Sequence, residues 1–167
     1  MLQPWTPVIA IHAIVATAAL VLGGFNLLRR KRGDRLHRAV GRTWVIFMLF
    51  VSAGSFFIGG LHGYVEPLGI FLHALAAWTI VSLSLGVLFA RRGNVRRHRG
   101  FMIGTYCGLV AATIGVVVVP SRRVPSYFHA YPGLFAAITV GIIAVSVLVI
   151  QSLAIVLAWR RPRTAAL

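Results

Sequence analysis

Long uncharged apolar runs, separated by short polar connections, occupy most of the chain. Each run has roughly 18 to 26 residues, and about 20 consecutive apolar residues are enough for a helix to cross the hydrocarbon core of a bilayer. Five such runs are present, at 8–28, 43–60, 67–90, 101–119 and 133–158. The pattern predicts an all-α fold, an integral membrane bundle of five transmembrane helices.

The composition favours a membrane protein over a soluble one. Of 167 residues, 59% are hydrophobic and 11% are charged, which is more apolar surface than a soluble domain of this size can bury. Lys and Arg number 17 against 2 Asp and Glu, a net charge of +15. In a soluble chain this excess would suggest nucleic acid, but here the basic residues lie between apolar runs. The expected partners are the lipid bilayer and anionic head groups at its cytoplasmic face, with no nucleic acid.

The distribution of basic residues predicts an orientation. Fifteen of the 17 lie in the connections 29–42 and 91–100 and in the tail 160–167. By the positive-inside rule these segments face the cytoplasm, which places the N-terminus outside and the C-terminus in the cytoplasm. Trp44 lies near the start of the second run, where an aromatic belt at the membrane interface is expected. The single cysteine, Cys107, excludes an internal disulfide.

An internal repeat relates the first two runs to the next two. Shifting the chain by 61 residues aligns His12 with His73 and His37 with His98. In both intervening turns, a Gly suited to ending a helix precedes an Asp or Asn suited to capping the next. Two hairpins of the same orientation imply a pseudo-twofold axis along the membrane normal, which would bring the paired histidines face to face. We therefore expect one membrane domain, 1–167, with repeats 8–60 and 67–120 and an additional helix 133–158.

The aligned histidines predict a haem site. An unpaired imidazole among lipid tails is unfavourable, so histidines inside spans face the bundle and have a partner. Two neutral histidines on facing helices, with small residues nearby, suit bis-imidazole ligation of haem iron. His12 and His73 would hold an outer haem b, and His37 and His98 an inner one. Five arginines near the inner pair suit forked hydrogen bonds to haem propionates: Arg35, Arg38, Arg42, Arg96 and Arg99.

Other interpretations of the same residues stay open. A histidine inside a span is also satisfied by one hydrogen bond within the bundle, and the arginines also suit lipid phosphates. The inner histidines alternatively frame a quinone or lipid site. His62, His129 and Glu66 lie at the outer ends of spans or in outer connections, where they suit a copper or zinc site or are surface residues.

Two basic motifs resemble the domain-of-unknown-function 2306 family, small bacterial predicted membrane proteins. The first motif, within 29–44, reads basic-Gly-Asp-x-x-His-Arg-x-x-Gly-Arg, and the second, 91–99, is followed by Met102 and Tyr106. The resemblance covers roughly residues 10 to 120 and includes the histidines of the first and third runs. It implies a location in the bacterial inner membrane and supports the importance of the four histidines, but it supplies no reaction. The histidine layout is also similar to that of ascorbate-reducible di-haem cytochromes of eukaryotic vesicles.

The leading functional hypothesis is a membrane b-type haem protein that carries electrons across or within the bacterial cytoplasmic membrane. The alternatives are a non-enzymatic subunit, or an assembly or metal-handling factor, of a respiratory complex, and a small proton-linked transporter. A respiratory complex or further copies of this chain are the expected protein partners. No hydrolase or transferase site is evident, because the two carboxylates, Asp34 and Glu66, lie in connections. Any enzymatic activity is expected to be electron transfer of the oxidoreductase type.

Overall fold

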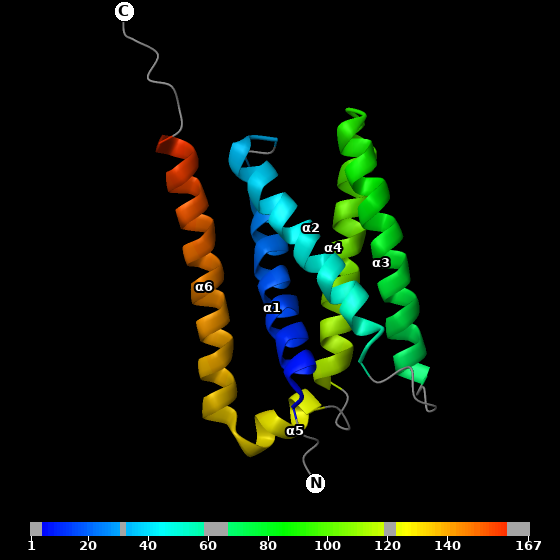
Figure 1. Ribbon diagram of the computed structural model, residues 1–167, viewed down its shortest axis with the longest axis vertical. Helices are drawn as coiled ribbons and strands as arrows, with labels where there is room; N and C mark the ends of the chain where they lie inside the picture. The colour runs from blue at the N-terminus through cyan, green and yellow to red at the C-terminus, as the bar shows by residue number, and fades with distance from the viewer. Residues whose placement is uncertain (1–4, 31–32, 59–66, 119–122, 160–167) are drawn as a thin grey trace, which may run out of the picture.

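The computed structural model describes residues 5–30, 33–58, 67–118 and 123–159. Within these segments the regular secondary structure is entirely α-helical (Figure 1). The helices are α1 (Pro7–Leu28), α2 (Arg35–Ser55), α3 (Pro67–Arg91), α4 (Val95–Val118), α5 (Arg123–Ala130) and α6 (Pro132–Trp159). The expected all-α membrane bundle is confirmed, with a short additional helix, α5, that the sequence did not predict.

Glycine turns and polar caps set the helix ends at the two basic connections. Gly33 and Gly93 have φ angles of 80° and 73°, in the left-handed region where a side chain is strained. Asp34 follows Gly33, and its carboxylate accepts a hydrogen bond of 2.8 Å from the backbone N–H of His37. Asn94 follows Gly93 and caps α4 in the same way. Its side-chain oxygen accepts a hydrogen bond from the backbone N–H three residues later. The predicted Gly and Asp/Asn roles in the two turns are confirmed.

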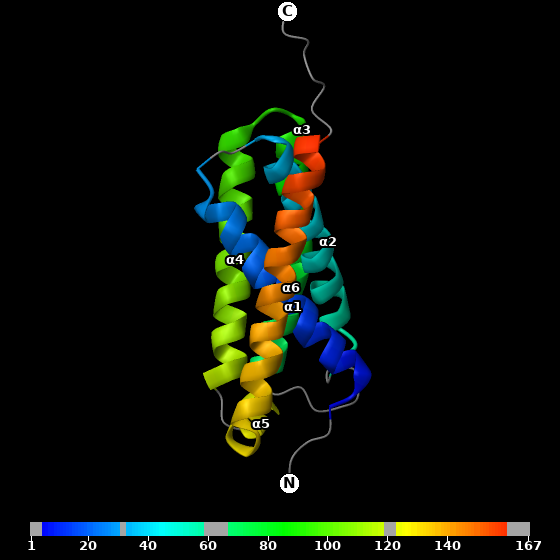
Figure 2. The ribbon, with the colours of Figure 1, turned by 90° about the vertical axis from the view of Figure 1, so that its left-hand side faces the viewer.

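Helices α1 to α4 form a ring in chain order. α1 packs against α2 and α4, and α3 packs against the same two helices. Among the described residues, the diagonal pairs α1 with α3 and α2 with α4 make no close backbone approach across the centre. α6 packs outside the ring against α1 and α2, and α5 leads into it from the α4 side (Figures 1 and 2). Both basic connections lie at one end of the molecule, which we call the basic end.

α2 is the element in which sequence and structure differ most. Among the described residues, four helices are long and apolar enough to cross a membrane, namely α1, α3, α4 and α6. α2 begins at Arg35 and ends at Ser55, whereas the expected span was 43–60, the last two residues of which lie outside the described part. Its uncharged portion, 43–55, is about 20 Å long at 1.5 Å per residue, shorter than the roughly 30 Å of a bilayer core. The fifth crossing is therefore not confirmed.

The buried core lies in the half of the ring nearer the basic end. Trp44 is 4% exposed and points into this core, so its expected place at the membrane interface is wrong. The close packing depends on Gly23 of α1, because a Cβ there would lie 2.6 Å from Nε1 of Trp44 and 2.6 Å from the ring of Tyr106. The buried core residues are Ala19, Leu22, Val40, Trp44, Met48, Leu83, Leu109 and Ile150.

Candidate functional site

A cavity of about 540 Å³ occupies the other half of the ring, away from the basic end, and we call it the central cavity. All four ring helices line it, and α5 and α6 contribute residues at its side. It exists because the diagonal helices stay apart and because small residues face the centre. Its volume falls within the range of about 300–1,000 Å³ that is typical of ligand and cofactor sites. The small lining residues are Ala10, Ala13, Ala16, Ala76, Gly108 and Ala112.

His12 supplies an imidazole to the central cavity. Its Nδ1 atom is buried and has no hydrogen-bond partner among the described residues. The ring lies beside Gly54 of α2, where an added Cβ would be 3.6 Å from Nδ1. Leaving a buried imidazole nitrogen without a hydrogen-bond partner is unfavourable, so Nδ1 of His12 is a group that a water molecule or a ligand would stabilise.

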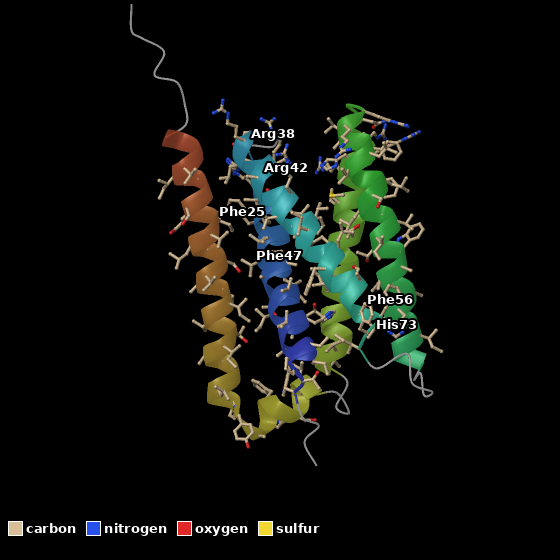
Figure 3. The ribbon with its side chains drawn as sticks, in the orientation of Figure 1. Phe25, Arg38, Arg42, Phe47, Phe56 and His73 are labelled. Carbon is tan, nitrogen blue, oxygen red and sulfur yellow. The ribbon has the colours of Figure 1, made fainter. Side chains whose placement is uncertain are left out.

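His73, the residue expected to pair with His12, lies elsewhere. Its Nε2 donates a hydrogen bond of 3.1 Å to the backbone carbonyl of Ser55, at the end of α2. Its ring stacks on Phe56 with centroids 5.6 Å apart, as Figure 3 shows. His73 is not part of the lining of the central cavity. The structure therefore brings His12, but not His73, to the cavity.

The inner histidines, His37 and His98, lie on opposite corners of the ring near the basic end. Nδ1 of His98 donates a hydrogen bond of 2.9 Å to the carbonyl of Gly86, which leaves Nε2 as the unprotonated nitrogen of the neutral ring. The carbonyl of His37 accepts a hydrogen bond of 3.3 Å from the side chain of Asn26. The helices that carry the two histidines, α2 and α4, do not pack against each other in the described part. Neither histidine lines the central cavity.

The basic residues near these histidines face solvent. Figure 3 shows Arg38 and Arg42 at the basic end, and both are exposed, as are Arg35, Arg96 and Arg99. Arg38 donates a hydrogen bond of 2.7 Å to the carbonyl of Gly33, so one arginine helps to close the turn. The exposed positions of Arg42, Arg96 and Arg99 suit phosphates or carboxylates at the membrane surface.

The carboxylate of Asp34 forms an ion pair with a neighbouring arginine. Arg29 donates two hydrogen bonds to its carboxylate, of 2.5 and 2.6 Å. These bonds, with the backbone N–H of His37, lower the pKa of Asp34 from 3.8 to about 2. Asp34 is thus the N-cap of α2 and the ion-pair partner of Arg29.

The expected outer copper or zinc site receives no support from the described residues. His62 and Glu66 lie outside them. His129 is exposed at the end of α5 and packs edge-on against Phe128, with centroids 5.9 Å apart. Across the described part of the chain, no three His, Cys, Asp or Glu side chains come together as metal ligands.

Sequence reasoning missed the polar groups of the packed half. Trp44 was assigned to the interface, and Asn26 was not singled out although it is the only amide in the first apolar run. Tyr106, noted in the second motif, donates its hydroxyl hydrogen to the carbonyl of Leu20, 3.2 Å away on α1. Met102, from the same motif, packs closely on Gly86. Both motif residues therefore join α4 to other helices of the ring.

These features define a polytopic α-helical membrane protein with an apolar central cavity. The chain belongs to a family described as predicted membrane protein (DUF2306), which it matches over residues 9–155. The resemblance seen in the two basic motifs is thereby confirmed, and it extends into α6. No curated protein and no solved structure matches the chain.

Proposed function

We propose that this protein is a b-type haem protein that carries electrons in the bacterial cytoplasmic membrane, with one haem in the central cavity and His12 as its iron ligand. The observation that supports the proposal is the position of His12. His12 lines the 540 Å³ cavity, and its buried Nδ1 has no hydrogen-bond partner among the described residues.

The remaining lining fits a flat, largely apolar macrocycle. Small residues on three ring helices leave room for a flat group to approach the helix backbones. The hydroxyls of Thr17 and Thr113 donate to carbonyls one turn back, so they present little free polarity to the cavity. When bound, haem supplies one-electron redox chemistry, while the chain provides the iron ligand and the low-dielectric surroundings that tune the potential.

The residue that would hold the iron together with His12 is the point on which sequence and structure differ. The repeat pairs His73 with His12, but His73 does not line the central cavity, and its Nε2 donates a hydrogen bond to the carbonyl of Ser55. We therefore assign His12 the principal role and His73 a secondary one. His98 has the carbonyl-anchored Nδ1 that is typical of ligand histidines, and with His37 it is the proposed inner ligand pair, with quinone or copper as the alternative occupant.

Haem loading of two alanine variants tests this assignment. His12→Ala is expected to purify with about a tenth of the haem per chain of the wild type. Under limiting haem, a tenfold loss corresponds to the removal of about 1.4 kcal/mol of binding energy. His73→Ala is expected to retain haem and to shift its spectrum from low-spin to high-spin. His129→Ala, which alters an exposed histidine outside the cavity lining, is the matched control. Equal haem loss in the His12 and His73 variants would contradict the unequal roles.

The proposed topology places the basic end in the cytoplasm. α1 starts at the opposite end and α6 finishes near the basic end (Figure 1). The exposed arginines then contact anionic head groups of the inner leaflet. Reporter fusions after Trp159 that signal from the periplasm would contradict this orientation.

A further inference from the structure

The polar interior of the packed half continues the lining of the central cavity. On α2, Trp44 lies one turn nearer the basic end than Met48, which lines the cavity. On α4, Thr105 has the same relation to Leu109. Because residues four apart share a helix face, Trp44 and Thr105 lie on the cavity-facing sides of their helices, one turn closer to the basic end. Both side chains are buried, at 4% and 5% exposed.

Three polar atoms in this region lack hydrogen-bond partners among the described residues. They are Nε1 of Trp44, Oγ1 of Thr105 and Oδ1 of Asn26. Buried polar atoms of this kind are normally satisfied by ordered water when protein groups do not reach them. Because the three atoms lie on three different ring helices, α1, α2 and α4, a single local packing defect does not account for them.

Nε1 of Trp44 and the side chain of Asn26 occur at successive levels along the bundle axis. Nε1 of Trp44 lies against Gly23, and Asn26 follows Gly23 by three residues, almost one turn closer to the basic end. One helical turn is about 5.4 Å, and a water that makes two hydrogen bonds of about 2.8 Å bridges roughly that distance. One water is therefore sufficient to connect these two levels. At the level of Asn26, Nδ2 of this residue donates a hydrogen bond to the backbone carbonyl of His37, in the first turn of α2.

We propose that Thr105, Trp44 and Asn26 hold a file of water molecules that conducts protons between the central cavity and the basic end. The hydroxyl of Thr105 both accepts and donates, so it can pass a proton onward. The indole N–H of Trp44 only donates and Oδ1 of Asn26 only accepts, so these two groups orient the waters. Each proton that enters at one end is matched by one that leaves at the other, and no bond of the protein changes.

The charge at the basic end permits such a path. The arginines there, including Arg38, Arg42 and Arg96, are exposed, so solvent and salt screen their repulsion of a proton. The proposal extends beyond electron transfer and does not rest on the presence of haem. A proton route into a redox cavity would also allow electron transfer to be coupled to proton uptake.

The test is proton flux through the full chain in liposomes that contain a trapped pH-sensitive dye. A potassium gradient with valinomycin supplies the driving potential. Wild-type vesicles are expected to acidify faster than protein-free vesicles. Thr105→Val removes the hydroxyl at nearly constant volume and is expected to slow the flux about tenfold, equivalent to about 1.4 kcal/mol of barrier. The matched control is Thr43→Val, because the hydroxyl of Thr43 donates to the carbonyl of Ala39.

Each outcome decides the proposal. Flux no faster than that of protein-free vesicles overturns it, as does a Thr105→Val flux equal to that of the wild type. If Thr105→Val only raises the melting temperature, the hydroxyl lies in a dry core and no conducting file exists. Trp44→Phe is the second variant, should Thr105→Val fail to fold, and it is expected to slow the flux as well. Equal slowing by Thr43→Val would attribute the effect to general disturbance of the bundle.

Discussion

Replacing Gly23 with alanine should destabilise the bundle, although alanine is the better helix former. The added Cβ would lie 2.6 Å from Nε1 of Trp44 and 2.6 Å from Cδ2 of Tyr106, so at least one ring must move. Neither ring moves freely. Trp44 is 4% exposed, and the hydroxyl of Tyr106 is tied to the carbonyl of Leu20. Overpacking of this kind costs about 1–3 kcal/mol, and with two rings in contact we take the upper value.

The helix propensity of alanine offsets part of that cost. Gly→Ala in a helix interior gains about 1 kcal/mol, which leaves a net destabilisation of about 2 kcal/mol for Gly23→Ala. Gly104→Ala is the matched control, since a Cβ at Gly104 of α4 meets nothing within 4 Å. It should stabilise the protein by up to about 1 kcal/mol. The two substitutions, chemically identical, are expected to have opposite signs.

Thermal unfolding of the detergent-solubilised protein, followed by far-ultraviolet circular dichroism, measures the difference. For a chain of this size about 1 kcal/mol corresponds to roughly 2–4 °C. Gly23→Ala should therefore melt about 4–8 °C below the wild type and Gly104→Ala about 2–4 °C above it. If Gly23→Ala is as stabilising as Gly104→Ala, Trp44 and Tyr106 do not pack on α1, and the core described here is incorrect.

Two further predictions concern the ion pair and the membrane-facing surface. Because Arg29 holds the pKa of Asp34 at about 2 against 3.8, the stabilisation from Asp34 is complete above about pH 4 and is lost as the pH falls through 2. Asp34→Asn keeps the cap but removes the ion pair, so melting temperatures measured from pH 5 to pH 2 should fall less steeply than in the wild type; parallel slopes would refute this. Cys107, the only cysteine, is exposed on α4, so a nitroxide attached to it in nanodiscs should relax faster with oxygen than with a water-soluble nickel chelate. The reverse order would place this face of α4 in water.

The hydrophobic pattern and the turn residues sufficed to predict most of the helices. Apolar run lengths indicate four of the long helices, because in a bilayer the backbone of a spanning segment must satisfy its own hydrogen bonds. The turns at Gly33 and Gly93 were predictable because a left-handed φ selects glycine and an exposed helix start selects Asp or Asn. Both rules depend only on local chemistry.

Features that depend on contacts between helices were not predictable. Tryptophan is common at membrane interfaces, but Trp44 packs in the core, where the absence of a side chain at Gly23 of α1 leaves room for its indole. The repeat placed His12 and His73 as equivalents, whereas Ser55 and Phe56, which have no motif of their own, hold His73 aside. Side-chain partners across helices decide these positions.

The central claim, that the cavity beside His12 holds haem, is tested most directly by the reduced-minus-oxidised visible spectrum of the purified protein. A pyridine haemochrome assay on the same sample gives the haem content per chain. The account predicts sharp b-type bands and one haem per chain in the central cavity, or two if the inner histidines are also occupied. A featureless spectrum from protein produced in cells with ample haem would contradict the claim and leave the cavity to a different ligand.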